Sequence, residues 1–195
     1  MILDLVRHAD TGRRGRMDGR SDPPLLAGVA DALASRHAGI GWARAVTSPL
    51  RRAHDTALAL AAPQGIGVTI DPRWAEFDFG GWDGRRGDEL PAEAVAAFHA
   101  DPLRHPPPGG EDWGIFGKRI ADGLRALLAH GADGDGPVLV VSHAGALRMA
   151  LTQACGLPLA ALWALRIDYG TRLRLRLGED GEGRLWGELL ELSQP

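Results

Sequence analysis

The stretch LVRHADTG, residues 5–12, links an apolar strand to a polar turn. Residues 1–6, MILDLV, predict a short buried strand that leads directly into Arg7 and His8. In open α/β sheets, ligands bind beyond the carboxyl ends of the strands. The stretch therefore favours an α/β fold that places an arginine and a histidine where a small anion binds.

The stretch LVVSHAG, residues 139–145, has the same form. A strand-like apolar run ends at His143, and small residues then open a helix. Two histidines at the carboxyl ends of two inner strands can face one pocket. The backbone N–H groups at the start of the following helix would also favour an anion. His8 and His143 are therefore the first candidates for a shared anion site.

Two further stretches contain charged side chains that are candidates for the same site. TSPLRRAHDT, residues 47–56, leaves a strand and enters a helix with two arginines near its start. EFDFGGWDG, residues 76–84, holds carboxylates between aromatic residues, where burial can raise the pKa of a carboxyl group. Glu76 and Asp78 compete for a role in the second stretch, as Arg51 and Arg52 do in the first.

Strands alternate with helices along most of the sequence. The predicted strands are 1–6, Ala43–Thr47, Gly67–Ile70 and Pro137–Val141, with Leu173–Leu177 and Leu185–Leu192 as a late pair. The predicted helices are Leu25–His37, Leu50–Ala62, Pro91–Ala100, Ile115–His130 and Ala144–Cys155. This alternation predicts an α/β fold of three layers, α/β/α, with a mainly parallel central sheet. With no repeat or linker, residues 1–195 are expected to form one domain.

Local signals refine this outline. Asp112 is a predicted N-terminal cap for the helix that follows it, and Gly156 is expected to end the helix at Cys155. DPLRHPPPGGED, residues 101–112, is too stiff and too interrupted by glycine for regular structure. It is either a surface connection or a loop that borders a substrate pocket.

Composition narrows the class of protein. Hydrophobic residues make up 45% and charged residues 24% of the chain, which is typical of a globular protein. A net charge of −3 gives no bulk attraction to nucleic acid or to an anionic membrane. The single cysteine, Cys155, is expected to be a buried thiol in a reducing compartment, which favours the cytoplasm. No apolar run approaches the length of a membrane span.

Together the four stretches resemble the histidine phosphatase superfamily, also called phosphoglycerate mutase-like. The matching motifs are Arg7-His8, Ser48-x-Leu50-x-Arg52-Ala53-x-x-Thr56, Glu76…Gly80-x-Trp82-Asp83-Gly84 and Ser142-His143-Ala144-Gly145. They occur in the order of the family and span most of the chain. Each motif alone is modestly specific, whereas the four in sequence are highly specific.

The resemblance implies a role for each matching residue. His8 becomes the nucleophile and Glu76 the proton donor, while Arg7, Arg52 and His143 bind the phosphate. Thr11, Arg14 and Ala144 are further expected substrate contacts, although Thr11 is equally a candidate turn residue. The implied protein is a phosphomonoester hydrolase that forms a phosphohistidine and needs neither a metal nor a cofactor. Its partner is a small phosphorylated substrate, and the chain is a monomer or a homodimer.

The physical chemistry of these residue types fits the implied roles. A nucleophilic imidazole must be neutral, and nearby arginines disfavour its charged form. Guanidinium groups and His143 would neutralise the charge on the transferring phosphoryl group. The leaving alkoxide needs a proton from Glu76, which afterwards acts as a base for water.

Two positions depart from the family pattern. The glycine that usually follows the Arg-His pair is Ala9 here, and its side chain is expected to limit the turn or the approach of phosphate. The asparagine often found six residues after the nucleophile is Arg14. The phosphate contact of that asparagine is therefore lost or is replaced by a cation.

The compact length favours the phosphatase branch of the superfamily over the longer cofactor-dependent mutases. A finer resemblance is to the α-ribazole-5′-phosphate phosphatases of cobalamin biosynthesis, carried by EFDFGGW at 76–82, Gly110-Glu111 and LWALRIDYG at 162–170. The alternatives are phosphoglycerate mutase-type phosphoryl transfer, a non-catalytic relative that binds a phosphate ligand, and a metal-dependent phosphoesterase built on His8-Ala9-Asp10.

Overall fold

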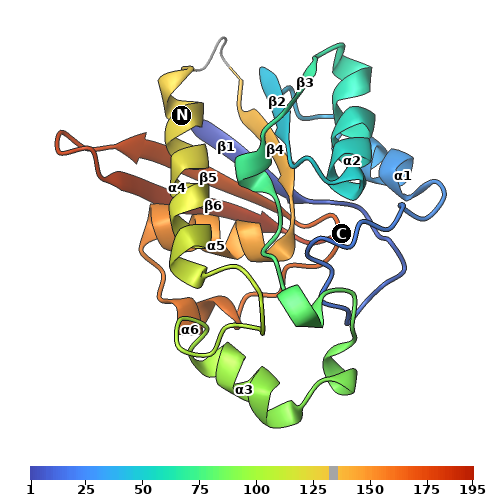
Figure 1. Cartoon of the computed structure of the whole chain (residues 1–195). Helices are drawn as coiled ribbons and strands as arrows, with labels where there is room; N and C mark the ends of the chain where they lie inside the picture. The colour runs from blue at the N-terminus through green and yellow to red at the C-terminus, as the bar shows by residue number, and fades with distance from the viewer. Residues whose placement is uncertain (132–135) are drawn as a thin grey trace.

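The computed structural model describes residues 1–131 and 136–195, and within them six strands form one sheet in the order β3-β2-β4-β1-β5-β6 (Figure 1). The strands are β1 (Ile2–Arg7), β2 (Arg44–Thr47), β3 (Val68–Ile70), β4 (Val138–Ser142), β5 (Arg172–Glu179) and β6 (Leu185–Ser193). The four strands β1 to β4 pair in parallel, and β5 and β6 extend the sheet antiparallel. The mainly parallel sheet and the late pair of strands are therefore confirmed.

Helices cover both faces of this sheet (Figure 1). The α-helices are α1 (Val29–Arg36), α2 (Arg51–Ala61), α3 (Ala92–Ala100), α4 (Trp113–Ala129), α5 (Ala144–Cys155) and α6 (Leu159–Leu162). Short 3₁₀ helices lie at Ala62–Gln64, Pro72–Trp74, Gly80–Trp82 and Gly87–Glu89. None of the helices in the described part of the chain is both long and apolar enough to cross a membrane.

The central strand β4 shows why the layers form. Its apolar residues alternate between two cores, with Val138 and Val140 packed among residues of α4 and α5, and Leu139 and Val141 among residues of α1 and α2. All four are fully buried. A parallel strand that is covered on both faces has to be apolar at every position. The expected α/β/α arrangement is confirmed.

Three local expectations differ from the structure. Helix α1 begins at Val29 and not at Leu25, because Gly28 has a φ of +74° and the Leu26 N–H donates to the Asp10 carbonyl instead of to a helical carbonyl. Leu26 is 49% exposed and does not belong to the buried helix face. Cys155 is half-buried, not fully buried. The cap at Asp112 is present, since its carboxylate accepts from the Ile115 N–H at 2.9 Å.

The loop at 101–112 packs against the segment that follows Glu76. The Gly81 N–H donates to the Pro108 carbonyl at 2.8 Å, and the Glu111 N–H donates to the Asp78 carbonyl at 2.9 Å. A Cβ on Gly80 would lie 2.3 Å from the Gly110 nitrogen, so this approach requires glycine. The loop therefore supports the 76–84 segment from outside, and it lines a neighbouring hollow, not the cavity of His8.

A buried charge cluster holds β5 to the middle of the sheet. Asp4 of β1 is fully buried and accepts hydrogen bonds from Arg172, Arg174 and Trp42. Burial alone would raise the pKa of Asp4, but the bonds from Arg174 and Trp42 and the charge of Arg172 outweigh burial and lower the pKa. The cluster is stable because each charge lies beside an opposite one.

Replacing Asp4 by Asn should lower the free energy of unfolding by about 3 kcal/mol, because Arg172 and Arg174 would lose the charge that compensates their burial. Urea denaturation with a matched control checks this. Lys118 and Asp122 form an ion pair whose side chains are 77% and 41% exposed. Lys118→Ala should cost much less than the Asp4 change. Equal losses in the two variants would contradict the proposed importance of the buried cluster.

Candidate active site

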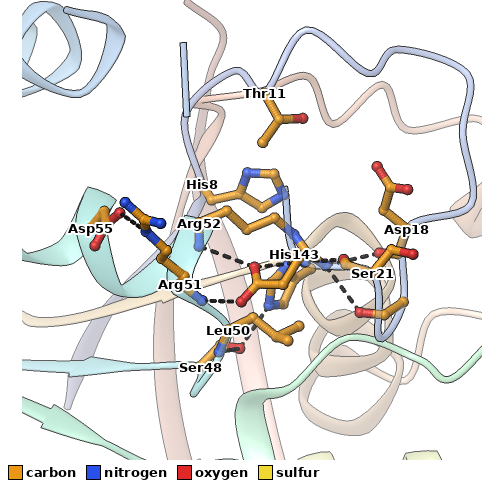
Figure 2. A network of polar contacts seen from close by, with 12 residues as sticks. His8, Thr11, Asp18, Ser21, Ser48, Leu50, Arg51, Arg52, Asp55 and His143 are labelled. Carbon is orange, nitrogen blue, oxygen red and sulfur yellow. Dashed lines mark hydrogen bonds and ion pairs between the residues drawn. The ribbon is translucent and has the colours of Figure 1, made fainter. Parts of the chain in front are cut away.

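The parallel pairing of β1 with β4 places His8 and His143 side by side. Arg7 lies opposite Ser142 in the register, and the His8 N–H continues the ladder by donating to the Ser142 carbonyl at 2.9 Å. The two imidazole ring centroids are 5.2 Å apart, and both side chains are buried. Figure 2 shows the two rings next to each other at this end of the sheet.

The hydrogen bond at one ring nitrogen determines the tautomer of His8. His8 Nδ1 lies 2.8 Å from the Ala9 carbonyl oxygen. Because a carbonyl only accepts, Nδ1 must carry the proton, and the lone pair of the neutral ring is then on Nε2. This arrangement provides a nucleophilic nitrogen on the opposite side of the ring from the backbone.

The surroundings of His8 also keep its ring neutral. Burial lowers the pKa of His8 well below its usual value, and the charges of Arg7 and Arg52 lower it further. The hydrogen bond to Ala9 acts in the opposite direction but is outweighed. At neutral pH the imidazole is therefore deprotonated at Nε2, as the expected nucleophile must be.

His143 is held from the neighbouring strand β2. Its Nε2 lies 2.7 Å from Ser48 Oγ, which also accepts from the Leu50 N–H at 3.2 Å (Figure 2). Burial lowers the pKa of His143 well below its usual value, with further contributions that include the charge of Arg52. Ser48 therefore acts both as a turn residue and as the partner of His143.

Arg7 retains donors for a ligand. Its NH1 donates to the Ile167 carbonyl at 2.7 Å, and its guanidinium carbon lies 3.9 Å from the centroid of the Tyr169 ring. Within the described residues, the buried Arg7 Nε has no hydrogen-bond partner. Arg7 lines the same cavity as His8.

Arg52 has a different set of partners. Its side chain is buried. NH1 donates to the Ser21 carbonyl at 2.6 Å and to Asp22 at 3.2 Å, and NH2 donates to the carbonyls of Asp18 and Gly19. Both terminal nitrogens are thus bonded to the segment 18–22, which Figure 2 shows lying over the side chain. In the ligand-free protein, Arg52 contributes a charge to the site and anchors this segment.

Glu76 accepts hydrogen bonds at the start of α5. Its carboxylate accepts from the N–H groups of Phe77 at 2.9 Å, Gly145 at 3.0 Å and Ala146 at 3.2 Å. Asp78, the competing carboxylate, instead pairs with Arg20 at 2.7 Å and lines a different hollow. The structure therefore brings Glu76, and not Asp78, to the cavity of His8.

The backbone around Glu76 is fixed by Arg119 of α4. Arg119 NH1 donates to the carbonyls of Arg73 at 2.8 Å and Ala75 at 2.9 Å, and NH2 donates to the Glu76 carbonyl at 3.3 Å. Glu111, from the loop at 101–112, pairs with the same guanidinium at 2.8 Å. This network positions the segment that carries the expected proton donor.

These side chains surround a cavity of about 190 Å³. Its lining includes Arg7, His8, Thr11, Arg52, Glu76 and Ala144, together with Gly145. Arg14 is not among them, because it lies in an adjoining hollow of about 450 Å³ and pairs with Asp10 at 3.3 Å. The expectation that Arg14 replaces a phosphate-binding asparagine does not agree with this position.

Ala9 does not obstruct the cavity. Its side chain packs in the core beneath α1 and α2 and borders the adjoining hollow, while its N–H donates to Thr56 Oγ1 at 3.0 Å. No residue other than glycine has a positive φ in the described ranges, so Ala9 fits the turn without strain. The expected limit on the turn is therefore wrong, and Ala9 is not among the residues that line the cavity of His8.

The far wall of the cavity consists of residues that the sequence did not identify as site residues. They are mostly aromatic and come from segments that are far apart in the sequence: Phe79, Phe98, His99, Trp113, Trp163 and Tyr169, with Met17, Arg16 and Arg148. His99 and Trp163 lie with ring centroids 4.8 Å apart. No periodic pattern could have connected His99 of α3 with Trp163, which follows α6, because the two residues come together only in the folded chain.

Comparison with known proteins agrees with this geometry. The sequence profile of the histidine phosphatase superfamily (branch 1) matches residues 3–187. The chain belongs to this superfamily. The four motifs all fall within the matched residues.

Several relatives of this histidine phosphatase carry a named activity. The adenosylcobalamin/alpha-ribazole phosphatase of Escherichia coli (strain K12) is 29% identical over 87% of each chain. A glucosyl-3-phosphoglycerate phosphatase of Mycolicibacterium vanbaalenii is 33% identical over 80% of this chain and 75% of the relative. The crystal structure of the alpha-ribazole phosphatase from Shigella flexneri superposes with a TM-score of 0.80 at 26% identity, covering 100% of this chain and 96% of that one.

The histidine phosphatase also matches longer proteins. It is 34% identical to a bifunctional protein of Mycobacterium tuberculosis, and it spans 48% of the length of that protein.

Within residues 1–131 and 136–195, no group of three or more His, Cys, Asp or Glu side chains is placed to hold a metal ion.

The two buried histidines should make the stability of this histidine phosphatase depend on pH. Their pKa values are lowered in the folded chain, so below about pH 6.5 the unfolded chain binds more protons and the free energy of unfolding falls. Urea denaturation between about pH 7 and pH 5 checks this, and His143→Gln should reduce the slope. The exposed His105 is the control, since His105→Gln should leave the slope unchanged. A free energy of unfolding that does not change over this range would contradict the neutral, buried state of both rings.

Gly145→Ala should displace the Glu76 carboxylate without unfolding the protein. A Cβ at this position would lie 2.3 Å from Glu76 Oε1, at the end of a flexible side chain. We expect kcat for alkyl phosphates to fall by about 10- to 100-fold and kcat for a reactive aryl phosphate to fall far less, since only the poor leaving group needs the proton.

The double variant Gly145→Ala, Glu76→Gln tests whether the glycine acts through Glu76. It should be no slower than Glu76→Gln alone, because the group that the alanine displaces is then already unable to donate. Losses in kcat that multiply in the double variant would contradict this assignment.

Proposed function

We propose that the protein hydrolyses phosphomonoesters through a phosphohistidine on His8. The observation that carries this proposal is the neutral His8 ring, with Nδ1 bonded to the Ala9 carbonyl and Nε2 free. Arg7 and Glu76 line the same cavity as His8, and the His143 ring lies beside the His8 ring. The phosphatase activities of the named relatives support the same reaction.

In the first step, His8 Nε2 attacks the phosphorus and the bond from phosphorus to the leaving oxygen breaks. Arg7 donates to the phosphoryl oxygens, and the charge of Arg52 stabilises them. Glu76 gives its proton to the leaving oxygen, so the alcohol departs neutral. The products of this step are the free alcohol, phospho-His8 and the Glu76 carboxylate.

In the second step, water attacks phospho-His8. Glu76 takes a proton from the water, the new phosphorus–oxygen bond forms, and the phosphorus–nitrogen bond breaks. Neutral His8 is restored with its proton still on Nδ1. The amides of Gly145 and Ala146, which donate to the Glu76 carboxylate, are placed to stabilise the carboxylate that the first step leaves. This scheme uses no metal and no cofactor.

We also propose that the substrate is a nucleotide-like monoester, with α-ribazole 5′-phosphate as the leading candidate. The phosphatases from E. coli and S. flexneri support this assignment. The aromatic wall of Phe98, Trp113 and Trp163 suits a planar leaving group. Arg148 is near this wall, and each of its three side-chain nitrogens donates to a backbone carbonyl, of Ala144, Leu162 or Leu165. The mostly aromatic wall therefore favours a leaving group with a planar ring. We also propose that the protein is located in the cytoplasm.

The proposal is tested by kcat/KM for α-ribazole 5′-phosphate, 3-phosphoglycerate and a generic aryl phosphate, all measured with a chelator present. We expect turnover of all three to survive the chelator and the first substrate to be preferred by at least about tenfold. A preference for 3-phosphoglycerate with transfer of the phosphoryl group to a second sugar acid would instead support the mutase alternative.

His8→Ala should abolish turnover while the fold remains intact by circular dichroism, and acid-quenched wild type should retain a labile phosphate that the variant lacks. Substantial activity in His8→Ala would overturn the phosphohistidine scheme. Loss of wild-type activity in the chelator would point to metal-dependent hydrolysis.

A further inference from the structure

We propose that Tyr169 is a positioning residue for Arg7, whose ring holds the guanidinium plane so that the free donors of Arg7 are presented to the substrate phosphate. This inference rests on the proposed phosphate site, and it assigns a role to the single tyrosine of the chain. Tyr169 lines both the cavity of His8 and the adjoining hollow, so its ring is the wall between them.

The contacts around Arg7 restrict its side chain from two sides. The guanidinium carbon lies 3.9 Å from the Tyr169 ring centroid, which is close enough for a stacked cation–π contact. The Ile167 carbonyl accepts from NH1 at 2.7 Å. A planar group that is stacked on one face and bonded at one nitrogen has little freedom to rotate.

Burial makes this contact important for Arg7. Burial lowers the pKa of the guanidinium, and the nearby charge of Glu76 counteracts that effect. The face of an aromatic ring attracts a cation most strongly where water is excluded. Tyr169 thus stabilises a charge that the site needs for phosphate but that burial disfavours.

The backbone keeps Tyr169 in place independently of its side chain. The Gly170 N–H donates to the carbonyls of Arg7 at 3.1 Å and His8 at 3.2 Å, and the Arg7 N–H donates to the Thr171 carbonyl at 3.0 Å. Gly170 has a φ of +76°, and a Cβ there would lie 2.9 Å from Leu33. The segment after Tyr169 is therefore fixed to the end of β1, beside the catalytic histidine.

The aromatic ring of Tyr169, and not its hydroxyl group, positions Arg7. The Tyr169 hydroxyl lies 3.3 Å from Thr11 Oγ1, which is long for a hydrogen bond between two hydroxyl groups. The Tyr169 ring centroid lies 5.3 Å from that of His8, so the ring also packs beside the nucleophile. Phenylalanine should therefore substitute for Tyr169, whereas leucine should not.

The experiment measures the affinity of the site for inorganic phosphate. The Kd for orthophosphate comes from isothermal titration, and the inhibition constants of orthophosphate and vanadate come from hydrolysis of an aryl phosphate. Tyr169→Leu should weaken all three by about 5- to 30-fold, and Tyr169→Phe should change them by less than about threefold. Because titration needs no turnover, the test remains informative even if the proposed hydrolysis fails.

A double-mutant cycle shows whether Tyr169 acts through Arg7. Lysine lacks the planar group that stacks on the ring, so Tyr169→Leu should have little further effect in an Arg7→Lys background. Leu33→Ala is the control for packing, because Leu33 is buried next to Gly170 but lines only the adjoining hollow of the two. It should lower the melting temperature without weakening phosphate binding.

Three outcomes would overturn the proposal. The first is a phosphate affinity of Tyr169→Leu within about twofold of wild type, which would make the contact merely structural. The second is an equal loss in Tyr169→Phe, which would assign the effect to the hydroxyl. The third is an undiminished effect of Tyr169→Leu in the Arg7→Lys background, which would show that the ring acts on another group.

Discussion

The parallel, in-register pairing of β1 with β4 is the constraint on which the site depends. Arg7 lies opposite Ser142 in this register, so the residues that follow, His8 and His143, emerge at the same edge with neighbouring rings. A shift of one residue in either strand would turn its side chains to the other face of the sheet. The apolar residues of β4 prevent such a shift, because each of them fills one of two different cores. The packing of the fold thereby fixes the geometry of the chemistry.

The second constraint on the site is electrostatic, because the charges of two arginines lie close to the two buried histidines. Arg7, Arg52 and His8 line one small cavity, with the His143 ring beside that of His8, and burial together with the arginine charges keeps both rings neutral. The bound phosphate would relieve this unfavourable electrostatic environment. The proposed binding of phosphate follows from this arrangement, because an anion would offset the charges of the two arginines.

The sequence predicted the parts of this protein whose signals are local. The apolar runs that became β1 and β4 end directly at the histidines, so both the strands and the ring positions could be inferred from pattern alone. The start of α1 was misjudged because one glycine, Gly28, adopts a positive φ that apolar spacing does not reveal. The direction of the side chain of Arg14 could not be predicted either, because Gly12 before it also has a positive φ and the following chain depends on that turn. The aromatic wall could not be predicted, since Phe98 of α3 and Trp163, which follows α6, come together only in the folded chain.

The two arginines of the site differ in how much of their hydrogen-bonding capacity is free. Both terminal nitrogens of Arg52 are bonded to the segment 18–22, which leaves only its Nε without a partner among the described residues. Among the same residues, the Arg7 guanidinium donates one hydrogen bond, to Ile167, and it rests on an aromatic ring that stabilises its charge without using any of its donors. A substrate phosphate can therefore receive hydrogen bonds from Arg7 at once, whereas Arg52 acts on it first through charge. The division follows from the partners of each side chain: carbonyl oxygens compete with phosphate for the donors of an arginine, and a π face does not.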